Sequence, residues 1–248
     1  MKKGKKKSSD DRKRRMIDLS IVVPAYNEEE SVQKAILEIF KTFRKAKINL
    51  ELILVDDGST DNTLDICKKL KRKYLFKIIH LKKNKGYSKA LHTGFLQAKG
   101  KYLTYIDADL QYHPSQILKL YNNVVTQNYD FVIGHCRKKW YRGKGYRIFR
   151  RLASKFYNLL IRVLFKIKIK DVHSKRVFRR SLIDFKKMKV YYGLIDFELL
   201  YHAVKNKAKI KQVPIEVKPR FAGKSKLNIR LMLMTLLNLF RLRFDKER

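Results

Sequence analysis

The feature that most constrains the fold of this sequence is an alternation of apolar and amphipathic segments between residues 17 and 133. The apolar segments are short and almost continuously hydrophobic, which is typical of strands buried on both faces of a sheet. They cover 19–24, 50–55, 76–81, 102–106 and 129–133. The amphipathic segments have the apolar spacing of helices, over 29–45, 62–73, 87–98 and 114–127. This alternation predicts βαβ units, and therefore an α/β fold with a mostly parallel sheet flanked by helices.

Polar side chains follow the predicted strands where each strand ends. They occur at 26–28, 56–57, 84–86 and 107–109. Ligands of parallel α/β sheets bind outside the carboxyl ends of the strands, so these clusters predict one binding site at that edge. No G-x-G-x-x-G follows the first strand, which disfavours a dinucleotide site, and the absence of G-x-x-x-x-G-K-[ST] excludes a P-loop.

Asp107 and Asp109 directly follow the apolar strand 102–106. Residues i and i+2 of an extended segment point to the same side, so the two carboxylates can converge. Converging carboxylates repel each other unless a cation lies between them, and Mg²⁺ or Mn²⁺ suits such hard oxygen ligands. An ordinary acidic turn produces the same pattern. The pair alone therefore leaves both a turn and a divalent-cation site open.

The net charge of +38 predicts a polyanionic partner, which can be nucleic acid, an anionic membrane surface or a phosphorylated substrate. A hydrophobic content of 45% with 12% aromatic residues excludes general disorder. Cys67 and Cys136 show neither a metal-ligand spacing nor a disulfide framework, which favours a reducing compartment. Residues 1–16 form a basic tail without the apolar core of a signal peptide, and we expect this tail to be disordered.

The chain resembles the family 2 glycosyltransferases of the GT-A fold in motifs that share their order and spacing. The motifs are VVPAYNE at 22–28, VDDGSTD at 55–61, Asn84-x-Gly86, Gly94 to Gly100, and DADLQ at 107–111. Within that family the chain is most similar to dolichyl-phosphate mannose synthases and polyprenyl-phosphate glucosyltransferases. The resemblance runs from about residue 19 to 227 and implies a GT-A catalytic domain over 17–226.

The resemblance also implies roles at the donor site. One of Asp56 and Asp57 would contact the base, and we favour Asp56 because it ends its strand. A divalent cation, Mg²⁺ or Mn²⁺, would bridge the donor diphosphate and be held by Asp107, Asp109 and Gln111. The residues implied at the nucleotide sugar are Pro24, Ala25, Tyr26, Glu28, Asp56, Asp57, Lys85, Gly86, Asp107, Ala108 and Asp109.

Further residues are implied near the acceptor. The basic segment RFAGKSK at 220–226 resembles a loop that closes over phosphates in the family. Residues 170–180 resemble the family segment D-V-x-S-G-F-R-x-F-R-R, but here the segment is one residue short and lacks the glycine and the aromatic residue. The candidates for holding the acceptor phosphate are Arg137, Arg151, Arg220 and Lys224. Asp196 and Glu198 are acidic candidates near the acceptor, and charges that favour the start of a helix are the alternative interpretation.

Two segments have features of membrane-surface helices. Apolar residues at 149, 152, 153, 156, 160, 163 and 164 form a helical stripe with basic residues beside it. Packing on the domain is the alternative, but related enzymes place this region near the bilayer, so we expect 147–167 to lie in a membrane interface. The apolar run 231–240 is too short to span a bilayer, so 227–248 is predicted to be an interfacial anchor or a docking helix for a partner.

These features together predict an inverting glycosyltransferase that moves a hexose to dolichyl or polyprenyl phosphate. The implied donor is GDP-mannose, with UDP-glucose next. The implied location is peripheral, on the cytoplasmic face of a membrane, and a small membrane subunit stays open as a partner. One alternative is a family 2 enzyme that glycosylates a saccharide or protein hydroxyl, with Asp196 or Glu198 as the base. A basic nucleic-acid-binding protein is the remote alternative.

Overall fold

A mixed sheet forms the centre of the computed structural model, which describes residues 16–136, 144–218 and 229–244, without the side chains of 136, 144–154 and 229–233. In the described residues the sheet has seven strands in the order β3-β2-β1-β4-β6-β5-β7. The strands are β1 (Leu19–Ala25), β2 (Leu50–Asp56), β3 (Lys77–His80), β4 (Tyr102–Tyr105), β5 (Phe131–Cys136), β6 (Arg176–Arg179) and β7 (Ile210–Ile215). Only β6 runs antiparallel to its neighbours, β4 and β5, among the described pairings. The predicted mostly parallel sheet is confirmed, although the sequence did not predict β6 and β7.

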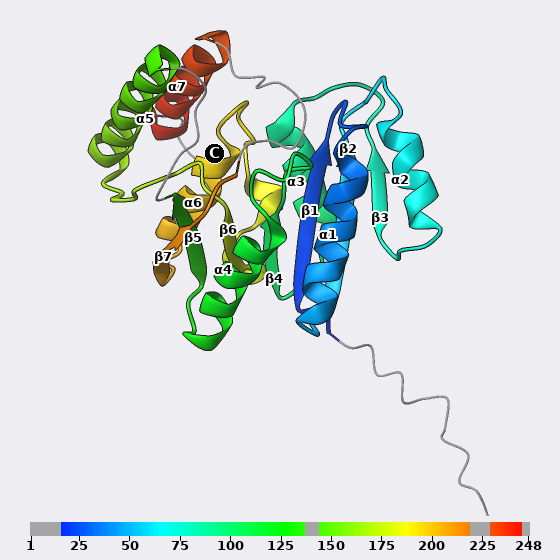
Figure 1. Cartoon of the computed structure of the whole chain (residues 1–248). Coiled ribbons are helices and arrows are strands. Elements are labelled where there is room, and N and C mark those ends of the chain that lie inside the picture. The colour runs from blue at the N-terminus through cyan, green and yellow to red at the C-terminus, as the bar shows by residue number, and fades with distance from the viewer. Residues whose placement is uncertain (1–15, 137–143, 219–228, 245–248) are drawn as a thin grey trace, which may run out of the picture.

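Helices cover both faces of this sheet (Figure 1). One face carries α1 (Val32–Lys45), α2 (Thr63–Lys71) and α4 (Pro114–Thr126), and the other carries α3 (Tyr87–Gln97) and α6 (Ile195–Lys205). Two 3₁₀ turns, Arg180–Leu182 and Phe185–Lys187, precede α6. The helices predicted at 29–45, 62–73, 87–98 and 114–127 are confirmed. Helix α1 begins later than predicted because the Glu28 carbonyl accepts hydrogen bonds from the Ser31 and Val32 amides and closes a turn there.

The strand β1 illustrates why the apolar segments are nearly continuous. Ile21 and Val23 pack in the core under α1 and α4, whereas Val22 packs in the core under α3. Gly94 of α3 lies directly on Val22, because a Cβ at Gly94 would be 2.4 Å from the Val22 Cγ1 atom. Both faces of the strand are therefore buried, as the sequence predicted.

Helices α5 (Lys144–Phe165) and α7 (Ile229–Phe244) pack against each other at the end of the molecule toward which β1 and β2 point (Figure 1). The predicted apolar stripe of α5 is divided in the structure. Leu160 and Leu164 pack on the core, but Phe156 and Val163 are 53% and 66% exposed. Tyr157 and Ile161, which lie outside the predicted stripe, are also buried in the core. The structure thus divides the apolar residues of α5 between the core and the exposed side, and the predicted place of 147–167 in a membrane interface stays a prediction.

Helix α7 is docked on the domain by its own side chains. Leu239 is fully buried in the core, and the Asn238 side-chain amide donates to the Tyr192 carbonyl at 3.0 Å. The Arg243 Nε atom donates to the Leu164 carbonyl of α5 at 3.0 Å. Every helix in the described residues is either too short or too polar to span a bilayer. The predicted boundaries at 17–226 and 227–248 remain predictions.

Candidate active site

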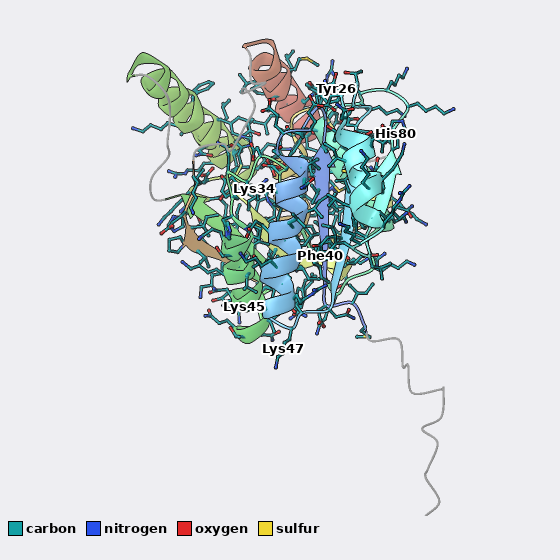
Figure 2. The ribbon with its side chains drawn as sticks, turned by 45° about the vertical axis from the view of Figure 1, so that its right-hand side comes forward. Tyr26, Lys34, Phe40, Lys45, Lys47 and His80 are labelled. Atoms are coloured by element: carbon teal, nitrogen blue, oxygen red, sulfur yellow. The ribbon has the colours of Figure 1, made fainter. Side chains whose placement is uncertain are left out.

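The polar clusters meet at the carboxyl ends of β1, β2, β3 and β4. Ala25 of β1 lies beside Asp56 of β2, which lies beside His80 of β3. Figure 2 shows Tyr26 and His80 at this edge. The loop after β1 is joined to the loop after β2, because the Asn27 amide donates to the Ser59 hydroxyl at 3.0 Å. The sequence prediction that these segments share one sheet edge is therefore confirmed.

Asp56 and Asp57 connect this edge to the segment 84–86. The Asp56 side chain is fully buried, and its Oδ2 atom lies 2.6 Å from Nδ1 of His80, whose side chain is 44% exposed. Asp57 accepts hydrogen bonds from the Lys85 and Gly86 amides, both at 2.8 Å. Both carboxylates thus stabilise the site architecture. The predicted contact between one of them and a nucleotide base stays a prediction.

Gly86 brings the segment before α6 into the site. Its φ of +86° is readily adopted by glycine, and a Cβ there would lie 2.6 Å from the Tyr192 ring. The Ser88 hydroxyl accepts a hydrogen bond from the Gly193 amide at 3.0 Å. Segments 84–86 and 192–193 are therefore in direct contact. Since Asn238 also holds Tyr192, helix α7 is connected to the edge of the site.

Asp107 lies just beyond β4, and both its carboxylate oxygens accept hydrogen bonds. The Tyr87 hydroxyl donates to Oδ1 at 2.9 Å, and the Lys175 ammonium donates to Oδ2 at 2.7 Å. The Lys175 side chain is 3% exposed, whereas the Asp107 side chain is 28% exposed. The Lys175 Nζ atom also lies 4.0 Å from the Tyr105 ring centroid and 5.3 Å from that of Tyr112. The Lys175 ammonium therefore occupies the position beside the Asp107 carboxylate.

Asp109 and Gln111 lie in the turn that follows. Asp109 is 5% exposed, and its Oδ1 atom accepts from the Gln111 amide at 3.1 Å. Leu110 between them has a φ of +54°. The structure therefore contains the turn, and the turn includes hard oxygen atoms of the kind that a divalent cation prefers. No three His, Cys, Asp or Glu side chains converge as a metal site in the described part of the chain. A cation held by Asp109 would therefore need further oxygen ligands, such as those of a diphosphate.

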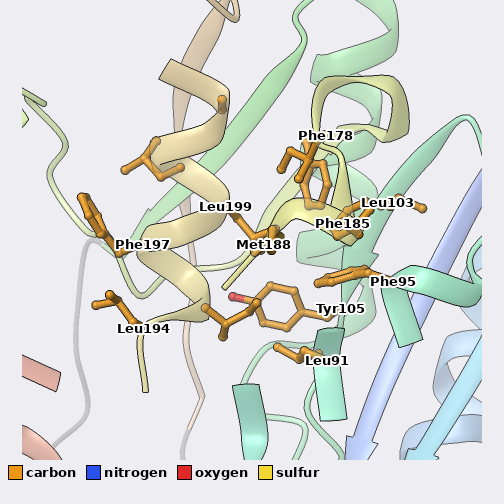
Figure 3. Close-up of a cluster of buried hydrophobic side chains, with 14 of the residues drawn as sticks. Leu91, Phe95, Leu103, Tyr105, Phe178, Phe185, Met188, Leu194, Phe197 and Leu199 are labelled. Atoms are coloured by element: carbon orange, nitrogen blue, oxygen red, sulfur yellow. The ribbon is translucent and has the colours of Figure 1, made fainter. Parts of the chain in front are cut away.

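Asp196 forms a buried network with Tyr105 and Arg176. The Tyr105 hydroxyl donates to Asp196, and the fully buried Arg176 guanidinium lies 2.9 Å from Asp196 Oδ1. His173 Nδ1 is 3.7 Å from the other oxygen. Burial by itself would raise the pKa of Asp196, but Arg176, His173 and Lys175 hold the pKa well below its usual range. Asp196 is therefore ionised and is a weak base. Figure 3 shows the Tyr105 hydroxyl directed toward the start of α6.

Glu198, two residues after Asp196 on α6, is 1% exposed. Its two carboxylate oxygens accept the Val190 and Tyr191 amides, at 3.1 and 2.6 Å. Burial raises the pKa of Glu198 to about 7, although these two hydrogen bonds act in the opposite direction. A pKa near neutrality suits a general base, but both oxygens face the protein backbone. The structure therefore gives Glu198 a definite role in holding the segment 190–191.

The remaining predicted residues fall into two groups. Pro24 and Ala25 end β1, Ala108 is 2% exposed beside Asp107, and the Glu28 carboxylate accepts from the Ser31 hydroxyl at 2.8 Å. The structure thus brings the donor-site candidates together. The acceptor-site candidates are not placed: Arg137, Arg220 and Lys224 lie outside the described residues, and Arg151 lies on α5 without a described side chain.

Sequence reasoning missed the residues that surround Asp107. Lys175 was available as a signal, because it lies in the segment that departs from the family pattern. Tyr87, Tyr105 and Tyr112 gave no comparable signal, since tyrosines at these spacings are ordinary core residues. Only the fold places them around a lysine from a segment far along the chain.

Comparison with protein families matches residues 20–185 to the glycosyl transferase family 2 model. A dolichol-phosphate mannosyltransferase of Pyrococcus furiosus is 31% identical over 90% of this chain and 63% of that protein. An undecaprenyl-phosphate 4-deoxy-4-formamido-L-arabinose transferase of Proteus mirabilis is 35% identical over 67% of this chain and 50% of that protein. A dodecaprenyl-phosphate galacturonate synthase of Rhizobium johnstonii is 31% identical over 67% and 49%. The chain thus spans about half to three fifths of the length of these relatives.

Solved structures confirm the GT-A fold expected from the sequence. Glucosyl-3-phosphoglycerate synthase from Mycobacterium tuberculosis, in complex with Mn²⁺, UDP and glucosyl-3-phosphoglycerate, matches with a TM-score of 0.68 and 17% identity over 93% of this chain and 81% of that chain. The same enzyme has been crystallised with Mg²⁺ and UDP. Staphylococcus aureus TarS matches with a TM-score of 0.56 and 21% identity over 79% and 58%. At these identities the likeness concerns the fold alone.

Proposed function

Because the chain belongs to glycosyl transferase family 2, we propose that it transfers a hexose from a nucleotide-diphosphate sugar to a polyprenyl phosphate. GDP-mannose is the favoured donor, followed by UDP-glucose. Dolichyl phosphate and related polyprenyl phosphates are the proposed acceptors, as the names of the similar transferases suggest. The choice of acceptor rests on one observation: the carboxylates of Asp196 and Glu198 both already interact with other groups of the protein.

A hydroxyl acceptor needs a general base within reach of its proton. Asp196 is a weak base because its pKa is lowered, and its oxygens contact Tyr105, Arg176 and His173. Glu198 is buried with both oxygens on backbone amides. These contacts argue against either residue as a base for a saccharide or protein hydroxyl.

A phosphate acceptor removes the need for a base. The second pKa of a phosphomonoester is about 6, so its oxygens are already ionised near neutral pH. In the proposed reaction a phosphate oxygen forms a bond to the anomeric carbon, and the bond from that carbon to the nucleoside diphosphate breaks with inversion. Arg137, Arg151, Arg220 and Lys224 are proposed to position the acceptor phosphate.

The leaving nucleoside diphosphate needs positive charge near it. A divalent cation, Mg²⁺ or Mn²⁺, would supply this charge, and we propose that Asp109 holds it together with diphosphate oxygens, with Gln111 nearby. The structures of similar fold with Mn²⁺ or Mg²⁺ support this proposal. Asp107 is proposed to act together with Lys175, which already donates to its carboxylate.

The acceptor assay tests this function directly. Labelled GDP-mannose or UDP-glucose is supplied with polyprenyl phosphate or with an oligosaccharide, in the presence of Mg²⁺ or Mn²⁺. The expected result is label in the organic phase with polyprenyl phosphate and none on the oligosaccharide. Label that enters only the oligosaccharide would establish the hydroxyl-acceptor alternative. Transfer to neither acceptor, together with tight salt-sensitive RNA binding, would favour the nucleic-acid alternative.

We also propose that α5 and α7 bind a membrane surface, which brings the lipid acceptor to the site. Phe156, Leu159 and Val163 of α5 are 53%, 53% and 66% exposed, and on α7 Leu237 and Phe244 are 61% and 68% exposed. Apolar side chains beside many basic residues are typical of interfacial helices. The proposed location is peripheral, at the cytoplasmic face.

Replacing Phe156, Leu159 and Val163 together with serine is expected to weaken vesicle binding about 100-fold, because three apolar side chains no longer enter the interface. Flotation with phosphatidylglycerol vesicles at physiological ionic strength measures the effect. Leu75→Ser is the matched control, since Leu75 is 95% exposed but lies outside both helices, and it should not change binding. Unchanged flotation of the triple variant would contradict membrane binding by this surface.

A further inference from the structure

Lys175 is the most unusual charged group near the candidate donor site. Its side chain is 3% exposed, and its ammonium lies 2.7 Å from the Asp107 carboxylate. Burial of an ammonium is costly unless it is paired, and here Asp107 and the faces of Tyr105 and Tyr112 supply the compensation. The aromatic rings and the carboxylate therefore hold the ammonium at one place. A solvated surface lysine would have no such fixed position.

The position of the Lys175 ammonium determines how a divalent cation could bind at Asp107. Asp107 Oδ2 already accepts from Lys175, and Oδ1 accepts from Tyr87. A metal ion that used Asp107 would have to displace one of these donors and would lie close to another positive charge. The residues therefore fit a cation held by Asp109 better than one held by both aspartates.

We propose that Lys175 is a resident cation of the donor site, which replaces the metal ion at Asp107 and stabilises the bound nucleoside diphosphate. The ammonium neutralises Asp107, whose side chain is 28% exposed and faces the site, so the diphosphate does not meet an uncompensated carboxylate. This inference rests on the proposed nucleotide-sugar donor. It adds a residue that lowers the electrostatic cost of binding the diphosphate in the absence of metal.

Metal affinity provides the first test, and it requires no transfer reaction. Mn²⁺ binding to the full chain without nucleotide is measured by electron paramagnetic resonance. Lys175→Met removes the charge but retains an unbranched stem, and it should bind Mn²⁺ at least about 10-fold more tightly than the wild type. Lys175→Arg should match the wild type. Lys68→Met is the matched control, because Lys68 also pairs with an aspartate, Asp65 at 3.1 Å, but is 61% exposed. Equal Mn²⁺ affinity of Lys175→Met and the wild type would overturn the proposal.

Nucleotide affinity provides the second test. Calorimetry with UDP and GDP in excess EDTA should show binding to the wild type and an affinity about 10-fold lower for Lys175→Met, since Asp107 would then face the diphosphate without its neutralising partner. Mn²⁺ should restore most of that loss. The wild-type measurement remains informative even if a variant does not fold. If the wild type binds neither nucleotide in EDTA but binds one in Mn²⁺, Lys175 is not the resident cation. If no nucleotide binds under either condition, the proposed function fails, while the Mn²⁺ measurement still decides the role of Lys175 at Asp107.

Discussion

Replacing Asp107 and Asp109 together with asparagine is expected to reduce sugar transfer at least about 100-fold, comparable to the loss of a charge-stabilising group in other active sites. The physical reason is that these carboxylates hold the positive charges that would face the diphosphate. Asp107 accepts from Lys175, and Asp109 is the proposed ligand of the divalent cation. The label transferred to polyprenyl phosphate in the acceptor assay measures the effect.

The control for this experiment is Asp65→Asn. Asp65 is 67% exposed on α2 and pairs only weakly with Lys68, so its replacement should leave transfer unchanged. The far-ultraviolet circular dichroism of the double variant should match that of the wild type. Full transfer activity in a folded Asp107→Asn, Asp109→Asn variant would show that the pair is only an acidic turn.

Asp196→Ala is expected to lower the free energy of unfolding by about 3–5 kcal/mol, the cost of leaving one member of a buried ion pair without its partner. Arg176 is fully buried, and its 2.9 Å contact with Asp196 would be lost. The Tyr105 hydroxyl would lose its acceptor as well. Urea unfolding monitored by circular dichroism measures the change.

Two variants define what that result means. Asp65→Ala should change the free energy of unfolding by at most about 1 kcal/mol, because Asp65 is 67% exposed and its ion pair with Lys68 lies at the surface. Asp196→Asn keeps one acceptor oxygen and nearly the same side-chain shape, so it should cost less than Asp196→Ala. If Asp196→Ala instead unfolds like the wild type but loses all transfer, Asp196 acts as a catalytic group and the structural role assigned to it is wrong.

Prediction from the sequence was most successful where a local pattern reports burial directly. The strands β1 to β5 and the helices α1 to α4 match apolar periods that are properties of the chain itself. The same periods did not reveal β6 or β7. Arg176 in β6 is fully buried and charged, so a hydrophobic pattern could not identify it as a core position. Its burial depends on Asp196, which lies on a later helix.

The orientation of α5 shows the limit of the same method. An amphipathic stripe predicts which side of a helix is apolar, but α5 has apolar residues on more than one side. Tyr157 and Ile161 are buried in the core, whereas Phe156 and Val163 are exposed. Contacts with the rest of the fold, including α7, decided between these sides. The sequence could not rank them because either side satisfies the helical period.

The motifs and apolar periods of the sequence were sufficient to predict the family, the α/β architecture and the sheet edge of the candidate site. Those properties follow from local spacing, since each polar cluster ends its own strand. The tertiary structure alone decided what surrounds Asp107. Tyr87 comes from α3 and Lys175 from the segment before β6, and both reach the same carboxylate. Contacts between residues so far apart in the chain depend on strand order and helix packing. Asp107 thus acquires its lysine partner only when the chain folds.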